Sequence, residues 1–172
     1  ERDIVRVIQT EPESAIAHHL LSRIMVRMFA RDPGELYSLK QASDLAQQSI
    51  ELEPTSDVGY VALADILDLM GNADRGLALL NEALASGLKP SWRMSFTKAR
   101  LMADDSKPEV VLKMLEEALA APLSEPRIIV PYVVALLQTD ASGTTLIAKL
   151  NEWNHKFPSP LFELTQAITL AE

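Results

Sequence analysis

Few residues in this sequence have the types and the spacing that catalysis or metal binding requires. His18 and His19 are adjacent, and adjacent residues on a helix point about 100° apart, so the pair is a poor chelate. Asp104 and Asp105 resemble paired catalytic carboxylates, but the Ser-Lys-Pro beside them is more typical of a solvated turn at a helix end. We therefore interpret both pairs as structural or solvated.

Motifs for other kinds of site are missing. The six glycines are not spaced as in a phosphate-binding loop, and no His-Glu-x-x-His pair is present. The chain has no cysteine to bind zinc and no Gly-x-Ser-x-Gly nucleophile motif. The sequence therefore predicts no enzyme, no cofactor and no metal.

Charge and hydropathy narrow the range of partners. The net charge of −8 should repel nucleic acid and anionic membrane surfaces. No apolar run is long enough for a membrane span, so we expect no membrane insertion by this chain. A chain without cysteine is compatible with either the cytoplasm or the periplasm, so the compartment stays open, with the cytoplasm slightly favoured. The chain starts at Glu1 without a Met, and we expect it to be a fragment of a longer protein.

The apolar residues recur at the spacing of helices, and no segment alternates as a strand does. Pro54 ends one helix, Ser56 lies among cap candidates for the next, and Gly71 and Gly87 suit helix ends. Pro131 is expected in the first turn of its helix. We predict a short helix over 2–10, helical hairpins over about 14–53, 56–86, 91–121 and 127–157, and a capping helix over 160–171.

Two segments indicate that these hairpins are internal repeats. "LLNEALASGLKP" and "MLEEALAAPLSEP" place Ala83 and Ala118 35 residues apart. Prolines punctuate the chain at steps of 42, 36, 36 and 32 residues, at Pro12, Pro54, Pro90, Pro126 and Pro158. The wider first step indicates an insertion of about eight residues in the first hairpin. A period in this range with two helices per unit is typical of an α-solenoid.

The repeat resembles the tetratricopeptide (TPR) family, which has a helix–turn–helix unit of about 34 residues. The third hairpin departs from the family pattern at Ser95 and Lys98. The resemblance implies an all-α, right-handed superhelical α-solenoid of about four hairpins and a C-terminal helix, forming a single domain over 1–172. The second hairpin matches best, with Tyr60, Leu63, Ala64, Leu67, Gly76, Leu80, Ala83 and Leu88, and the fourth aligns through Val130, Val133, Val134, Leu137, Leu150 and Trp153.

The resemblance also implies a function, because in this family the first helix of each hairpin lines a concave surface that takes a peptide. We therefore expect a scaffold or adaptor that binds a protein or peptide, with acidic groups facing the arginines. The alternative that these arginines are solvated or pair with neighbouring hairpins stays open. The expected partner-binding residues are His19, Arg23, Arg27, Val61, Asp65, Arg93, Phe96, Arg100 and Tyr132.

A second hypothesis is self-association as a homodimer, through an end hairpin or the C-terminal helix. If that helix only caps the array, its outer face should be polar, as Glu163 and Gln166 suggest. If it turns Phe162, Leu164 and Leu170 outward, it forms an interface instead. The family's Lys/Asn clamp for a C-terminal carboxylate is not matched at Ala62 and Thr97, so recognition of chaperone tails is not expected.

Overall fold

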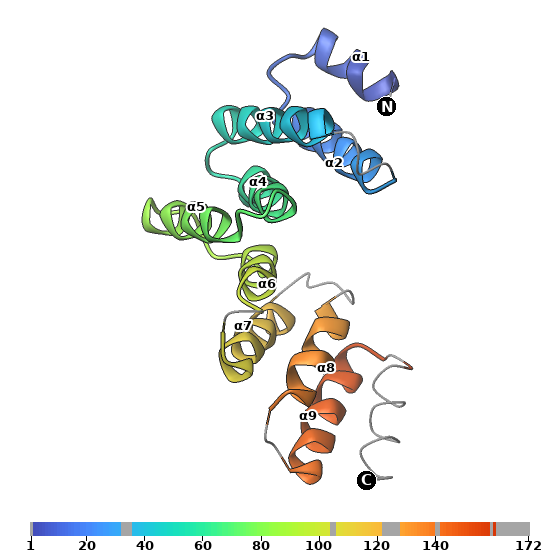
Figure 1. The fold of residues 1–172 in the computed structure, drawn as a ribbon, viewed down its shortest axis with the longest axis vertical. Coiled ribbons are helices and arrows are strands. Elements are labelled where there is room, and N and C mark those ends of the chain that lie inside the picture. Colours follow the sequence, from blue (N-terminus) through green and yellow to red (C-terminus); the bar gives the residue numbers. More distant parts are fainter. Residues whose placement is uncertain are drawn as a thin grey trace. The chain divides into compact units, whose positions relative to one another are not determined.

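Residues 2–31, 36–103, 106–121, 128–139, 142–158 and 160 are described by the computed structural model, and none of these residues lies in a strand. The all-α prediction is therefore confirmed (Figure 1). The chain divides into two compact units, Glu1–Pro90 and Ser91–Glu172, and the expectation of a single domain stays a prediction. The described helices are α1 (Arg2–Thr10), α2 (Ala15–Arg31), α3 (Leu36–Leu52), α4 (Asp57–Leu69), α5 (Ala73–Ala85), α6 (Trp92–Leu101), α7 (Pro108–Ala120), α8 (Ile129–Leu137) and α9 (Gly143–Lys156).

The first unit is built from the α2–α3 and α4–α5 hairpins, with α1 against α2 (Figure 1). The first helices of the two hairpins, α2 and α4, also contact each other. Small residues bring the backbones of α2 and α3 close together: Ser22 donates a hydrogen bond to the carbonyl of Ala42 at 2.8 Å, and both residues are buried. The core is made by one face each of α3 and α4, through Leu39, Ala42, Ala46, Ile50, Ala62, Leu63 and Ile66.

Helix α4 crosses α3 at a glycine. Gly59 is buried, and a Cβ added there would lie 2.8 Å from Cγ1 of Ile50 and 3.0 Å from its backbone nitrogen. Such distances are shorter than normal contacts, so a larger residue here requires a shift of the Ile50 side chain or of the helix crossing. Close packing of the two hairpins of the first unit therefore depends on this one position.

The first hairpin is longer than the second. Helices α2 and α3 have 17 residues each, whereas α4 and α5 have 13 each. The insertion expected in the first hairpin therefore appears as about one additional turn on each of its helices. On α2 this turn covers residues 28–31.

Two helix ends in the first unit follow the sequence signals closely. Gly71 and Gly87 have φ of +76° and +102°, the left-handed region that glycine adopts without strain. After α4, the N–H of Asn72 donates to the carbonyl of Leu67 at 2.8 Å, and after α5 the N–H of Leu88 donates to that of Ala83 at 3.0 Å. This is the Schellman arrangement, which satisfies carbonyls that the helix end leaves open.

The cap expectations were right in part. Ser56 is the N-cap residue of α4, but its side chain makes no capping hydrogen bond. Ser91, at the start of α6, does accept a hydrogen bond from the backbone N–H of Met94, at 3.3 Å. Helix α4 therefore begins after the Pro54 break without a capping hydrogen bond from the Ser56 side chain.

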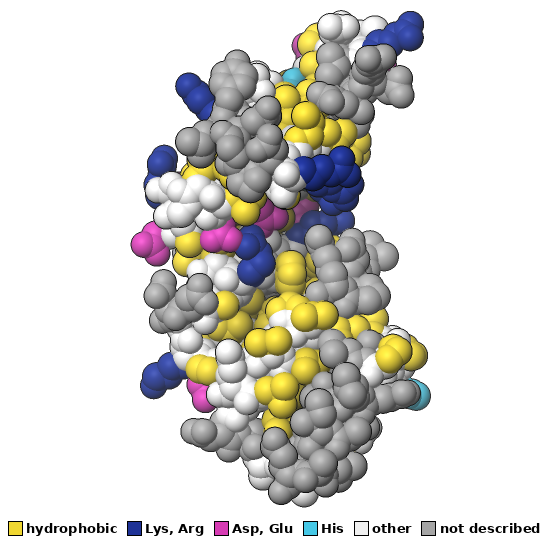
Figure 2. All heavy atoms as spheres, turned by 45° about the vertical axis from the view of Figure 1, so that its right-hand side comes forward, with side chains coloured by type: hydrophobic (Ala, Val, Ile, Leu, Met, Phe, Trp, Pro, Cys, Tyr) yellow, Lys and Arg dark blue, Asp and Glu magenta, His cyan; other side chains and the backbone are white. Residues whose placement is uncertain are grey.

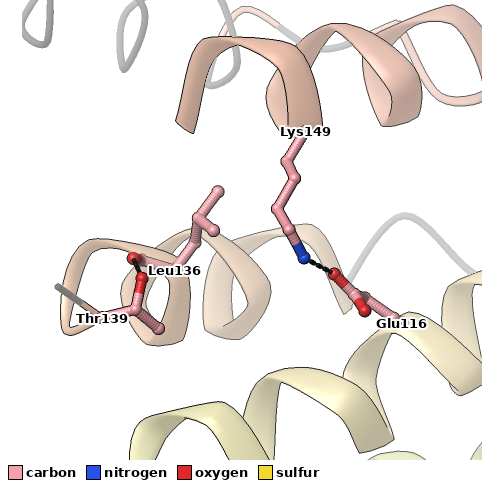
Figure 3. A network of polar contacts seen from close by, with 4 residues as sticks. All are labelled: Glu116, Leu136, Thr139 and Lys149. Carbon is pink, nitrogen blue, oxygen red and sulfur yellow. Dashed lines mark hydrogen bonds and ion pairs between the residues drawn. The ribbon is translucent and has the colours of Figure 1, made fainter. Parts of the chain in front are cut away.

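In the second unit α6 pairs with α7, α7 packs against α8, and α8 contacts α9. A single core joins these helices, with Ala99, Leu115 and Ala118 on α6 and α7 and Tyr132 and Leu150 on α8 and α9. Lys149 on α9 also pairs with Glu116 on α7 (Figure 3). Polar contacts and the shared core thus hold α9 against α7 as well as α8.

Helix α8 corrects the predicted packing of the fourth hairpin. The expected core positions Val130, Val134 and Leu137 are exposed, and the positions one residue earlier, such as Ile129 and Leu136, are buried. The segment is apolar on every side, so its pattern does not distinguish the two faces. Pro131 lies in the first turn, as expected.

The predicted capping helix over 160–171 lies, apart from its first residue, outside the described residues. The carboxylate pair Asp104 and Asp105 lies outside them as well. The hypotheses that rest on these two segments stay predictions.

Candidate interaction surface

One side of α2 carries a continuous stripe of exposed side chains, which we call the α2 stripe. It consists of Ile16, Leu20, Arg23, Arg27 and Arg31, all exposed. At about 100° per residue these positions fall within an arc of about 80°. Ile16 is 67% exposed and Leu20 is 40% exposed, which is high for side chains of this kind. The stripe therefore offers both apolar and basic groups to a partner.

The opposite side of α2 explains why this stripe faces outward. Ala17, His18, Leu21 and Ser22 are buried against the neighbouring helices, and Nδ1 of His18 lies 2.9 Å from the carbonyl of Ser14. Ala17 and Ser22 are small, which allows close packing, and the Ser22 hydroxyl donates to the carbonyl of Ala42 on α3. Packing fixes the rotation of α2 and leaves the stripe in solvent.

The three arginines of the stripe are unusual for an acidic chain. Arg23, Arg27 and Arg31 form no ion pair with any residue that the structure describes. Figure 2 shows Lys and Arg side chains next to hydrophobic ones in its upper half, where α1 to α5 lie. The expected basic groups on α2 are therefore exposed and form no ion pair with the described residues.

The other predicted site residues of the first unit are less available. Val61 on α4 is buried, and Asp65 is half-buried and already has an interaction partner. His19 is half-buried and also has an interaction partner. Leu69, four residues after Asp65 at the end of α4, is an exposed apolar residue. In the first unit the accessible part of the predicted site is thus centred on α2.

In the second unit the predicted residues of α6 are engaged. The guanidinium of Arg93 stacks on the ring of Trp92 at 5.0 Å, and Arg100 also has an interaction partner. Phe96 is half-buried against the core of this unit. Arg93 and Arg100 therefore interact within the protein itself, as in the alternative that the sequence left open.

The structure corrects the predicted position of Tyr132. It was expected on the binding surface, but its side chain is 0% exposed and packs edge-on against Trp153, with ring centroids 6.2 Å apart. Burial raises the pKa of the Tyr132 hydroxyl above its ordinary range, the carboxylates of Glu116 and Glu152 act in the same direction, and Trp153 opposes them. Tyr132 is therefore a core residue.

The exposed side of α8 is an apolar strip that the sequence assigned to the core. Val130, Val134 and Leu137 are 58%, 50% and 51% exposed, and they lie three and four residues apart on one face. Helix α8 has no charged residue. Hydrophobic side chains also gather on the surface in the lower half of Figure 2, over the second unit.

Other kinds of site find little support in the described part of the chain. There, no group of three His, Cys, Asp or Glu side chains is placed to hold a metal ion. None of the described helices has both the length and the hydropathy needed to cross a bilayer.

Sequence reasoning missed three members of the α2 stripe. Ile16, Leu20 and Arg31 were not among the expected partner-binding residues, although their spacing from Arg23 and Arg27 places all five on one helix face. Steps of three and four residues from Arg27 toward both ends of the helix lead to all three positions. The apolar members were overlooked because isolated exposed apolar residues are common on protein surfaces.

Comparison with known proteins supports the fold. No protein-family model matches the chain, and no curated protein matches it. Among solved structures, it is similar to TTC0263, a thermophilic TPR protein in Thermus thermophilus, with 19% identity, a TM-score of 0.68, and coverage of 79% of this chain and 71% of that chain. It is also similar to YrrB, a TPR protein with an unusual peptide-binding site, with 12% identity, a TM-score of 0.61, and coverage of 98% and 82%. The chain has a TPR-like helical-repeat fold.

Proposed function

We propose that this chain is a protein-interaction domain that binds a peptide or protein partner on the exposed faces of the first helices of its hairpins, the concave side of a TPR-type array. The observation that carries the proposal is the α2 stripe, where exposed apolar residues adjoin arginines without an ion pair to any described residue. Apolar contacts at such a surface contribute most of the affinity, and arginine adds directed hydrogen bonds to carboxylates.

The TPR-like fold supports the same proposal. TPR proteins present helix faces side by side, and α2 and α4 contact each other within the first unit. One of the similar structures is described as having a peptide-binding site, although the likeness at 12% identity concerns the fold. The binding role of this chain therefore rests on its own exposed residues.

Selection from a random peptide display library tests the proposal without a known partner. The intact chain is immobilised, the selected peptides are synthesised, and their affinities are measured in solution by fluorescence anisotropy. We expect selected peptides to lose affinity when Leu20→Glu is introduced on α2, and to keep it with Gln48→Glu on α3, which is also exposed. Selection of no peptide, or equal loss with both variants, would count against binding by the first helices.

Self-association is a second candidate, and the apolar strip on α8 favours it. Val130, Val134 and Leu137 form an exposed face on a helix without a charged residue, so two copies that meet there bury apolar area and no charge of α8. Light scattering after size exclusion, across a range of concentrations, measures this directly. A dimer that Val134→Lys dissociates and Asn81→Lys, at an exposed position of α5, does not would support self-association, and a monomer at all concentrations would remove it.

A further inference from the structure

The α2 stripe has a direction, because its apolar and basic halves lie at different ends of the helix. Ile16 and Leu20 occupy the N-terminal half, and Arg23, Arg27 and Arg31 follow toward the C-terminus. At a rise of about 1.5 Å per residue the stripe is roughly 22 Å long. The arginines lie four residues apart, so their side chains repeat about every 6 Å along the helix. A partner must match this order and this spacing.

The additional turn of α2 extends the basic half. A helix as long as α4, which has 13 residues, would end at Arg27 if it began at Ala15. The turn over residues 28–31 adds Arg31 to the stripe and brings Met28, which is also exposed, beside it. The longer first hairpin therefore gives α2 a basic end that the second hairpin does not have.

Charge indicates the chemistry of the occupant. The three guanidinium groups have no ion pair with the described residues, while the chain carries a net charge of −8. A partner with carboxylates gains paired, directed hydrogen bonds from arginine. Nucleic acid or an anionic membrane would meet the same arginines, but the net negative charge of the chain opposes the approach of an extended anionic surface. A short acidic segment avoids most of this repulsion.

We propose that the α2 stripe binds an acidic amphipathic helix of a partner protein. Its carboxylates lie over Arg23, Arg27 and Arg31, and its apolar side chains lie over Ile16 and Leu20. Carboxylates four residues apart on the partner helix repeat at the same distance as the arginines. This inference rests on the proposed function, and it adds the class of partner, the surface and the orientation.

The test uses two synthetic helical peptides of about five turns. On one face of each peptide, leucines occupy one half of the length, and Glu in one peptide or Lys in the other occupies the other half at four-residue spacing. Fluorescence anisotropy measures their binding to the intact chain at low and at physiological salt. We expect the Glu peptide to bind and the Lys peptide to bind weakly or not at all. Reversing Arg23, Arg27 and Arg31 to Glu should weaken binding of the Glu peptide at least about tenfold and reduce its salt dependence.

A matched control separates the surface from the net charge. The control variant reverses Lys40, Arg75 and Lys89 to Glu, which are exposed residues of the same unit, and it has the same net charge as the test variant. It should keep the affinity of the Glu peptide within about threefold. A second variant, Ile16→Ser with Leu20→Ser, should also weaken binding. Circular dichroism melting of every variant confirms that each is folded.

Other outcomes overturn the inference. If both triple variants weaken binding equally, net charge and not the α2 stripe determines affinity. If the Glu peptide does not bind, or if anionic lipid vesicles bind through the same arginines and the peptide does not, the partner is not an acidic helix. If peptides from the display selection bind but are insensitive to the Arg23, Arg27 and Arg31 reversal, the inference fails while the proposed function stands.

Discussion

At the scale of single residues, small side chains set how closely the helices approach. Ala42, Ala46, Ala64, Ala99 and Ala118 are fully buried. Sequence reasoning found Ala64 and Ala118 because they recur at matching positions of the repeat. It did not find Gly59, since a glycine inside a helix gives no signal of what lies opposite until the neighbouring helix is placed.

Gly59→Ala should destabilise the first unit. The added Cβ would lie 2.8 Å from Cγ1 of Ile50, so either the side chain or the helix crossing must shift. Alanine favours the helix by about 1 kcal/mol, and overpacking costs about 1–3 kcal/mol, so we expect a net loss of about 1 kcal/mol. Chemical denaturation measures it. Gly143→Ala, at the exposed start of α9, is the control and should not lower stability. An equal effect of both substitutions would refute the close crossing.

Tyr132 shows what sequence reasoning could not reach. Its aromatic ring fits either a binding surface or a core, and only the rotation of α8 decides between them. In the structure the hydroxyl is buried without a hydrogen bond of normal geometry to a described residue, and a weaker interaction with Trp153 opposes the rise in its pKa. Leaving such a group unsatisfied costs about 1–3 kcal/mol. Tyr132 therefore fills the core through its ring, and its hydroxyl is a cost to stability.

Tyr132→Phe should consequently be neutral or stabilising by up to about 1 kcal/mol near pH 8. The pKa of this hydroxyl is raised in the folded state, so the hydroxyl ionises more readily in the unfolded state. The stability of the original chain is therefore unchanged below the unfolded pKa of about 10 and falls as the pH rises above it. The advantage of the Phe variant should therefore grow between pH 8 and pH 11. Urea denaturation at both values measures this, and a variant that is less stable at both would indicate a hydroxyl that is satisfied in the fold.

At the scale of elements, helix ends were more predictable than helix faces. Gly71 and Gly87 stop α4 and α5 through local backbone geometry, which the sequence specifies directly. The face that α8 buries depends on its neighbours, and a segment of apolar residues on all sides contains no information about it. The one-residue shift in α8 moved Tyr132 from the expected surface to the core, and Val134 from the expected core to the surface.

Ala118→Leu tests the packing of α7 in the second unit. Ala118 is fully buried in the core, so three additional carbon atoms have no space, and we expect a loss of about 1–3 kcal/mol in the free energy of unfolding. Ala120→Leu, on the exposed side of the same helix, makes the same chemical change and should leave stability within about 0.5 kcal/mol. Thermal melting of both variants decides. Two variants that melt like the original chain would mean that α7 faces the other way.

At the scale of the whole molecule, the sequence repeat predicted the fold but did not predict which residues form the binding surface. Pairs such as Ala83 and Ala118 predicted stacked hairpins, because each hairpin buries its face only against a neighbour. Which arginines remain accessible depends on side-chain partners: Arg23 and Arg27 have no ion pair with a described residue, while Arg93 is held on Trp92. Sequence spacing treats these arginines as equivalent.

The central claim is that the chain binds its partner through the first helices of its hairpins. Hydrogen–deuterium exchange of the intact chain, with and without a peptide from the display selection, tests it most directly. We predict slower exchange in Ala15–Arg31, with a smaller effect in Asp57–Leu69, and little change in the second helices Leu36–Leu52 and Ala73–Ala85. Protection confined to the second helices, with Ala15–Arg31 unchanged, would contradict the account.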